Sequence, residues 1–533
     1  NDTNNRITTA TGSSGLNAEA SLTFDGTTLA LTGNQTVSGN IDIDGTTNLD
    51  AVDIDGAVDI DGAISVGNTL TVGVDDTGHD VKFFGATASR HVTWDESADS
   101  LILSGNLDVN DGTIKLDGNY PVGTDNVALG NAALDSVEAG GINNVAIGDD
   151  AGTAITTGDC NVAVGKNALT TSTTGAINTA VGYDTLCSTT TGGSNVAVGF
   201  TALCTNTTGI GNTAIGRESL KSSTTASYNV ALGMRSLCAN TTGANNTAVG
   251  CDALKLNTTG CLNVAVGVQS LDSTTTGVQN TAVGAAIMRA LTEGNHNTAV
   301  GAAALRTVTT GGCNIAIGVC ALRENTASFN TAVGACSLLC TTTGANNTAV
   351  GYNSLCKNTT GCRNTAIGLG VLKCNVTGLR NTGVGYASLV NNTANNNSAL
   401  GYDSLVLNTS GADNVAIGHC SLRANTTASN NTSVGSYSLQ ANTTGDELTA
   451  LGFKALNSNT TADYNVAIGA CSLCSNTTGT SNVGVGTSSL KCNTTASNNT
   501  AVGQNALVLN TTGTQNSALG TQSLGLNTTG NYN

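Results

Sequence analysis

The sequence predicts an all-β fold, a parallel β-solenoid or β-roll of about 24 seventeen-residue rungs behind an N-terminal β-repeat stem. From Asn126 onward the chain repeats N-[TV]-A-[VI]-G-x-x-[AS]-L-x-x-N-T-T-G-x-x in 24 complete units, and Asn533 stands where another would begin. Self-similarity at a short fixed period is typical of solenoids. The 533 residues include 67 Gly but one Pro, one Trp and six Phe, too few large side chains for several ordinary cores. The apolar residues, mostly Ala, Val, Leu and Ile, suit thin, regular layers.

Residues 1–37 are expected to form short strands separated by turns. Leu22–Phe24 and residues 28–31 have strand character, and Asp25-Gly26 between them is a hairpin turn signal.

Residues 38–75 form a second, shorter repeat, D-I-D-G, which we interpret as a β-repeat stem. Alternation places Ile43, Ile54 and Ile60 on one face of the segment and the carboxylates on the other. So narrow a segment cannot bury its apolar face alone, so copies from other chains are expected to cover it. The paired Asp could bind Ca²⁺, but their spacing does not match a complete calcium loop, and a solvated acidic face is the favoured interpretation.

Residues 76–120 are expected to form a small β-module. Val81–Phe84, residues 91–94 and residues 101–103 read as three strands around the only Trp, Trp94. Pro121 marks the junction with the repeat array, 121–533, because proline cannot donate to a β-ladder.

We number the positions of a unit 1 to 17 from its Asn. Position 5 is Gly in all 24 units, which predicts positive φ or a close backbone approach. Position 4 is always Val, Ile or Leu, and position 9 is Leu except at Gly152 and Met288, so both are predicted to fill the core. Position 3, nearly always Ala, suggests that another backbone passes close by. Position 1 is Asn except at Leu448, which predicts an amide ladder along the solenoid.

The N-T-T-G segment is expected to turn the chain, with Gly supplying positive φ. Units starting at Asn314 and Asn381 are sixteen residues long, one residue short near this turn, which indicates an exposed corner. Two short strands and two turns would then complete one rung. Because one chain offers only two or three core residues per rung, we expect a homotrimer in which three chains bury more surface.

The units resemble the repeats of phage tail-fibre proteins and, more loosely, the head repeats of trimeric autotransporter adhesins of the YadA type. The stretch GVDDTGHDVKFFGATASRHVTWDESADSLIL, residues 73–103, resembles segments of fibre-like structural proteins of marine phages, cyanophages among them. The resemblance implies a trimeric left-handed parallel β-roll, an elongated virion appendage assembled in the host cytoplasm, and a role in host attachment. Its implied partners are virion tail or baseplate proteins and a receptor on the host surface, glycans included. The acidic N-terminal part is expected to be the virion-proximal side of a longer product.

No enzyme constellation is present, and we predict no catalytic residue, cofactor or metal site. His79 and His91 lack Cys or carboxylate neighbours at ligand spacing, and His296 and His419 stand alone in the array. The seventeen Cys lie between residues 160 and 492, and Cys336 with Cys340 and Cys471 with Cys474 are close within a rung. We interpret them as small apolar residues in a reducing compartment, with scattered inter-rung or inter-chain disulfides as the alternative and metal binding as a weaker one. Other Cys lie just before or after the Leu at position 9, within two residues of it: Cys187, Cys204, Cys238, Cys320 and Cys356.

The charge and hydropathy of the chain exclude two classes of partner. Net charge is −17, of which residues 1–117 carry −15 (19 acidic against four basic), and no basic patch suggests nucleic acid. No apolar run approaches the ~20 residues of a membrane span.

The leading hypothesis is therefore a structural and adhesive virion appendage. The alternatives are a trimeric adhesin or extracellular filament of a bacterial surface and, more weakly, an ice-binding solenoid, which the lack of T-x-T on a flat face disfavours. Receptor contacts in the array would fall at positions 6, 7, 16 and 17. Examples are Tyr183, Arg217, Met234, Tyr352 and Tyr402.

Overall fold

The computed structural model describes residues 125–533 and, before them, residues 9–10, 16–17, 22–24, 29–31, 65–66, 81–84, 91–95 and 100–104. The chain divides into two compact units, Asn1–Ile114 and Lys115–Asn533. The described residues contain strands and turns and no helix, so the predicted all-β class is confirmed.

The first unit opens with two antiparallel strand pairs. β1 (Thr9–Ala10) pairs with β2 (Leu16–Asn17). β3 (Leu22–Phe24) pairs with β4 (Leu29–Leu31), as the Asp-Gly turn signal predicted.

A three-stranded antiparallel sheet follows, with β5 (Val81–Phe84), β6 (His91–Asp95) and β7 (Ser100–Leu103) in sequence order. The three predicted strands are confirmed. Trp94 lies on the central strand opposite Val81 and Leu101, but its side chain is 45% exposed and does not form the centre of a core. The D-I-D-G repeats, His79 and Pro121 lie outside the described residues.

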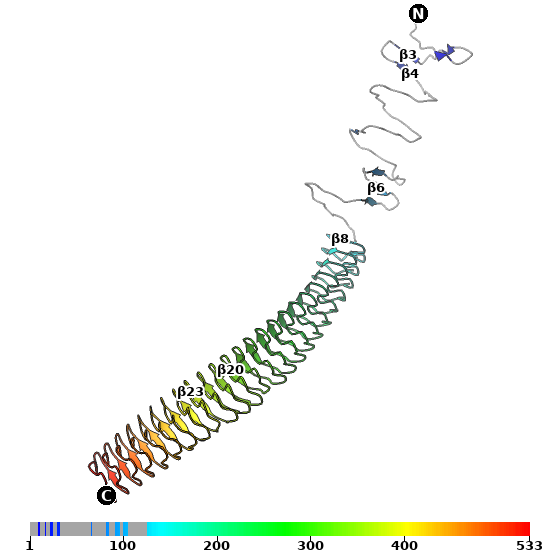
Figure 1. Cartoon of the computed structure of the whole chain (residues 1–533). Coiled ribbons are helices and arrows are strands. Elements are labelled where there is room, and N and C mark those ends of the chain that lie inside the picture. Colours follow the sequence, from blue (N-terminus) through cyan, green and yellow to red (C-terminus); the bar gives the residue numbers. More distant parts are fainter. Residues whose placement is uncertain are drawn as a thin grey trace. The chain divides into compact units, whose positions relative to one another are not determined.

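The second unit is a β-solenoid in which each rung contributes one three-residue strand (Figure 1). Its strands are β8 (Val127–Leu129), β9 (Val145–Ile147), β10 (Val162–Val164), β11 (Thr179–Val181), β12 (Val196–Val198), β13 (Thr213–Ile215), β14 (Val230–Leu232), β15 (Thr247–Val249), β16 (Val264–Val266), β17 (Thr281–Val283), β18 (Thr298–Val300), β19 (Ile315–Ile317), β20 (Thr331–Val333), β21 (Thr348–Val350), β22 (Thr365–Ile367), β23 (Thr382–Val384), β24 (Ser398–Leu400), β25 (Val415–Ile417), β26 (Thr432–Val434), β27 (Thr449–Leu451), β28 (Val466–Ile468), β29 (Val483–Val485), β30 (Thr500–Val502) and β31 (Ser517–Leu519).

These 24 strands pair in parallel, each with its neighbours in sequence and with position 3 opposite position 3. In the middle of the array, for example, Ala248 of β15 lies opposite Ala265 of β16. No residue pairing joins β31 to β8, so the strands form an open ladder, with β8 paired to β9 and β31 paired to β30.

The core of a rung is made by positions 1, 3, 8, 9, 12 and 15. In the rung 246–262 these positions are Asn246, Ala248, Ala253, Leu254, Asn257 and Gly260, and all six are buried. The predicted burial of position 9 is confirmed. The predicted burial of position 4 is wrong, since none of its 24 Val, Ile or Leu residues is buried. Side chains alternate along a strand, so the inward Ala at position 3 forces positions 2 and 4 to face outward. The crowding at position 3 comes chiefly from side chains: a Cβ on Gly383 would meet the Val371 and Ser388 side chains.

The rest of each rung is a chain of turns, and the predicted second strand is absent from every rung. Positions 7, 9 and 17 adopt left-handed backbone conformations, as Asp252 (φ 58°), Leu254 (φ 49°) and Leu262 (φ 59°) illustrate. The backbone N–H groups of these left-handed residues donate to carbonyls of both neighbouring rungs. Asp252 N donates to Met234 O of the preceding rung at 3.0 Å, and Leu254 N donates to Ser270 O of the following rung at 3.0 Å. These turns therefore hydrogen-bond adjacent rungs as a strand would.

Gly at position 5 has both of the predicted properties, a positive φ and a close approach to another backbone. Gly250 has φ of +131°, and a Cβ there would lie 2.6 Å from Gly267 O of the next rung. The Gly of N-T-T-G was interpreted wrongly, because position 15 has no positive φ in the array. Position 15 is usually Gly because a Cβ there would lie close to the carbonyl oxygen of the adjacent rung. Ala is nevertheless accepted at this position, since Ala428, Ala462 and Ala496 occupy it and are nearly fully buried.

A row of buried amides runs along the solenoid at position 1, and an interrupted second row runs at position 12. The predicted row at position 1 is confirmed: Asn246 N and Nδ2 donate to Asn229 Oδ1 at 2.9 and 3.1 Å. A second row, at position 12, was not predicted: Asn257 Nδ2 donates to Asn240 Oδ1 at 2.8 Å. The two rows meet within each rung, since Gly260 O accepts from Asn246 Nδ2 at 2.9 Å and from Asn257 Nδ2 at 3.0 Å.

The two sixteen-residue rungs keep the strand register. Ile315 pairs with Thr331 although only sixteen residues separate them, and the amide of Asn314 reaches Ala327 O thirteen residues away instead of the usual fourteen. The missing residue is absorbed at positions 13–15, which include an exposed position, so the predicted exposed corner is confirmed.

Two adjacent leucines test the assignment of the core. Leu338 at position 9 is fully buried, whereas Leu339 at position 10 is half-buried. We expect Leu338→Ala to lower the free energy of unfolding by about 2–5 kcal/mol because it leaves a cavity, and Leu339→Ala to lower it by about 1 kcal/mol or less. Urea unfolding curves of the two variants provide the comparison, and equal midpoints would contradict the assignment.

Two glycines of one rung test the backbone argument. Gly435 at position 5 has φ +135°, and a Cβ there would overlap Gly452 O, whereas Gly445 at position 15 is flanked by rungs that carry Ala428 and Ala462 there. We expect Gly435→Ala to destabilise the array by about 3 kcal/mol or more and Gly445→Ala by a small fraction of that. Thermal unfolding followed by circular dichroism would measure both, and a tolerated Gly435→Ala would refute the close approach.

Candidate ligand-binding surface of the array

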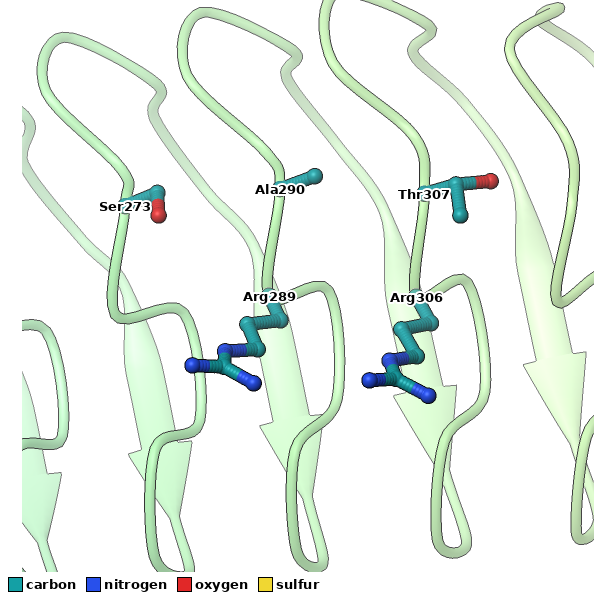
Figure 2. Close-up of a pocket in the computed structure, with 5 residues that line it drawn as sticks. All are labelled: Ser273, Arg289, Ala290, Arg306 and Thr307. Atoms are coloured by element: carbon teal, nitrogen blue, oxygen red, sulfur yellow. The ribbon is translucent and has the colours of Figure 1, made fainter.

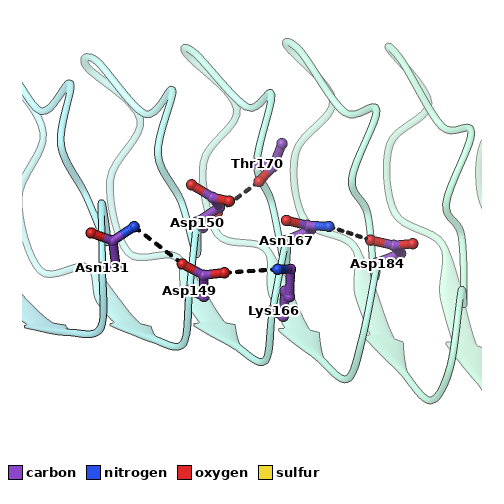
Figure 3. Close-up of polar contacts among 7 residues, drawn as sticks. All are labelled: Asn131, Asp149, Asp150, Lys166, Asn167, Thr170 and Asp184. Atoms are coloured by element: carbon purple, nitrogen blue, oxygen red, sulfur yellow. Dashed lines mark hydrogen bonds and ion pairs between the residues drawn. The ribbon is translucent and has the colours of Figure 1, made fainter.

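Because the rungs are in register, the side chains at one position form a row along the solenoid. Figure 3 shows such rows at positions 6 and 7 of the first rungs. Asp149 accepts from Lys166 Nζ at 2.8 Å and from Asn131 Nδ2 at 3.3 Å, and Asn167 Nδ2 donates to Asp184 Oδ1 at 2.7 Å. The hydrogen bond from Lys166 lowers the pKa of the Asp149 carboxyl and raises that of the Lys166 ammonium. Both groups are in open solvent, so the pair is screened and satisfied rather than poised for a ligand.

The candidate receptor-contact residues named from the sequence are all exposed. Tyr183, Arg217, Met234, Tyr352 and Tyr402 lie at the surface. They do not form one cluster in space, because Tyr183 and Tyr402 are many rungs apart in the ladder. Among the described residues no three His, Cys, Asp or Glu side chains lie close enough to hold a metal ion.

Aromatic residues form a row over five consecutive rungs. The ring centroids of Tyr386 and Tyr402 are 5.0 Å apart and those of Tyr402 and His419 5.3 Å, with interplanar angles of 8° and 16°. Tyr437 follows edge-on at 5.0 Å from His419, and Phe453 lies 6.3 Å further. The stacked rings cover one another's faces, so this row is better suited to stabilising neighbouring rungs than to stacking on a sugar.

Arginines occupy position 10 in three consecutive rungs, and we call Arg289, Arg306 and Arg323 the arginine row. Ala290 N donates to Arg306 O at 3.1 Å and Thr307 N to Arg323 O at 3.0 Å, so the three backbones are neighbours. Figure 2 shows the Arg289 and Arg306 side chains leaving adjacent rungs in the same direction. With Ser273, Ala290 and Thr307 they line a shallow depression of about 280 Å³.

The middle arginine has no counter-ion among the described residues. Arg289 Nε lies 3.4 Å from Asp272 Oδ2, and the Arg323 guanidinium lies 2.9 Å from Glu324 Oε1. Arg306 is exposed and makes no ion pair within the part of the chain that the structure describes. A guanidinium offers a planar fork of donors that matches carboxylate, sulfate and phosphate oxygens. The arginine row can therefore accept an anionic group at Arg306.

Sequence reasoning missed the arginine row, although the signal was present. Arg289, Arg306 and Arg323 are spaced by seventeen residues, the length of one rung. The array has slightly more acidic than basic residues overall, which concealed this local concentration of arginines.

The outer face of the sheet is apolar along its whole length. Position 4 contributes a row of 24 Val, Ile and Leu side chains, and position 2 beside it holds mainly Thr and Val. Half of the position 4 residues are exposed, among them Ile215, Ile317 and Ile367 at 37–41%, and the other half are half-buried. An apolar surface that extends over many rungs is typical of an interaction site.

Comparison with known proteins identifies no relative: no family model, no curated protein and no solved structure matches this chain. In the part of the chain that the structure describes, no helix is long and apolar enough to span a membrane.

Proposed function

We propose that the chain is the shaft of a structural and adhesive virion appendage, a phage tail fibre, which assembles as a homotrimer and contributes to host-cell attachment. The observation that carries the proposal is the apolar outer face of the sheet, repeated on every rung. The units' resemblance to tail-fibre repeats supports the virion assignment. In this proposal the appendage is extracellular and joins tail or baseplate proteins.

The outer face gives the homotrimer a physical basis different from the one expected from the sequence. The sequence suggested that a single chain has too thin a core, but a typical seventeen-residue rung, such as 246–262, buries six positions within one chain. Copies of the chain would instead pack through positions 2 and 4. A row of partly exposed Val, Ile and Leu removed from water at about 25 cal/mol per Å² supplies a driving force that grows with the number of rungs.

The first unit also exposes apolar side chains. Phe83 and Leu101 of the three-stranded sheet are each 61% exposed, and Trp94 is 45% exposed. A sheet this small gains stability when another layer covers it, and equivalent sheets from other copies would provide that layer.

Attachment requires a surface that binds a receptor, and the arginine row fits an acidic polysaccharide. Parallel neighbouring strands are ~4.8 Å apart, so Arg289, Arg306 and Arg323 present cationic groups at short, regular intervals along the solenoid. A carboxylated or sulfated sugar chain carries anionic groups repeatedly along its length. Arg306 would bind one such group directly, while Arg289 and Arg323 would exchange their carboxylate partners for the ligand.

The oligomeric state tests the structural proposal. We expect light scattering to give about three times the 52.8 kDa chain mass, with and without reductant. The triple variant Val333→Lys/Val350→Lys/Ile367→Lys places charges on the outer face of β20, β21 and β22, and it should lower the particle mass because buried like charges oppose packing.

The matched control places lysines on the same rungs at the exposed position 14, as Thr343→Lys/Thr360→Lys/Thr377→Lys. This control should retain the oligomer. A wild-type monomer, or equal dissociation of both variants, would refute association through the outer face.

Binding to immobilised polysaccharides tests the arginine row. We expect the protein to bind a polyuronate or a sulfated glucan but not a neutral glucan, and to lose affinity as salt rises. Arg306→Ala should weaken binding by about tenfold, equivalent to ~1.4 kcal/mol, and Arg306→Lys should restore part of it.

Arg217→Ala is the control, since Arg217 is an exposed arginine that pairs with Glu218 at 3.3 Å in another part of the array. Equal affinity of wild type and Arg306→Ala would refute the arginine row as the receptor site while leaving the trimeric shaft unaffected. Preferential binding of nucleic acid over acidic polysaccharide would also refute it.

A further inference from the structure

Two cysteines occupy position 10 in neighbouring rungs. Cys187 follows Leu186 in the rung that starts at Asn178, and Cys204 follows Leu203 in the next rung. No other two successive units both have Cys at position 10. All seventeen cysteines of the chain are free thiols in the structure, and these two bring their Sγ atoms to 2.8 Å from each other.

The backbone fixes this approach. Leu186 N donates to Ala202 O at 3.2 Å and Ser188 N donates to Cys204 O at 3.0 Å, so the chain is hydrogen-bonded to the next rung on both sides of Cys187. β11 and β12 of the same two rungs pair in register. Neighbouring parallel backbones lie ~4.8 Å apart, which falls within the ~4.4–6.8 Å between Cα atoms that a disulfide requires.

We propose that Cys187 and Cys204 are the site of an inter-rung disulfide, formed by exchange with a small disulfide oxidant such as glutathione disulfide. The Cys187 thiolate attacks one sulfur of the oxidant, forms a mixed disulfide and releases one glutathione thiolate. The Cys204 thiol then loses its proton and attacks the Cys187 sulfur, which releases the second glutathione. The protein loses two electrons and two protons, and the oxidant is reduced to two thiols.

The surroundings of the two thiols favour these roles. The hydrogen bond with the Cys204 thiol lowers the pKa of Cys187 to about 7, so a large part of it is thiolate at neutral pH. The same interaction, together with burial, raises the pKa of Cys204. Of the charged groups facing the pair, Asp184 raises both pKa values and Lys221 lowers that of Cys204. Both cysteines are half-buried, so a small oxidant reaches them more readily than a second solenoid would.

The consequence would be a second covalent link between two consecutive rungs, in addition to the backbone that already connects them. It would restrain the chain between residues 187 and 204, which contains β12 and its flanking turns. This inference does not depend on the proposed function, because it concerns stability of the array and not its partner.

Oxidation of the full-length protein tests the proposal. The reduced protein is incubated with glutathione disulfide, denatured, alkylated and digested with chymotrypsin, which can cleave after Phe200 between the two cysteines. We expect two fewer titratable thiols and a non-reduced peptide pair that joins Cys187 to Cys204. We expect the initial rate to rise about tenfold between pH 6 and pH 8 and then to level off, as the thiolate fraction does.

Cys187→Ser and Cys204→Ser should each abolish the cross-linked peptide. Cys238→Ser is the matched control, because Cys238 occupies position 10 but is separated from Cys204 by the rung that carries Lys221. It should leave the cross-link unchanged. A stable mixed disulfide on Cys187, a cross-link to a different cysteine, or a covalent dimer on a non-reducing gel would each overturn the proposal.

Discussion

Hydrogen bonding between buried asparagines holds the solenoid to its register. In most rungs the Asn at position 1 accepts two bonds from the next rung and donates to the Gly or Ala carbonyl at position 15 of its own rung, as Asn229, Asn246 and Gly260 illustrate. An amide removed from water without partners is costly, so a shift of register would leave whole rows unsatisfied. Leu448 shows how the row ends locally: its backbone N–H still donates to Asn431 Oδ1 at 2.9 Å, but its side chain cannot accept from Asn465.

The amide rows also explain which residues the core can contain. With positions 1 and 12 given to amides, the interior leaves room for Ala at position 3, a small residue at position 8 and Leu at position 9. In the rung 280–296, which lacks the amide at position 12, apolar residues fill the space: Ile287, Met288 and Leu291 occupy positions 8, 9 and 12, and all three are fully buried. The core of a rung therefore has a fixed volume, which is filled either by hydrogen-bonded amide side chains or by packed apolar side chains.

Much of the fold could be predicted from the period and from the positions filled by one residue type. Gly at position 5, Leu at position 9 and Asn at position 1 each indicated a physical requirement that the structure contains. The prediction of burial at position 4 was wrong because it relied on the apolar residue found there in every unit. Strand alternation makes positions 3 and 4 face opposite ways, so only one of them can be buried. The left-handed residues were not predictable from composition, since Leu is rarely found at positive φ; in this solenoid inter-rung hydrogen bonds compensate for the strain.

The candidate sites depend on a property that no single unit possesses. A rung places each side chain beside the equivalent side chains of its neighbours, so the chemistry of the surface is set by residues seventeen positions apart. Asp149 pairs with Lys166 of the next rung, whereas Arg306 lies between two other arginines without an ion pair among the described residues, and the Sγ atoms of Cys187 and Cys204 approach to 2.8 Å. Substitutions at exposed positions can therefore change function without disturbing the amide rows or the core. A solenoid of this kind can vary its surface rung by rung while its scaffold stays the same.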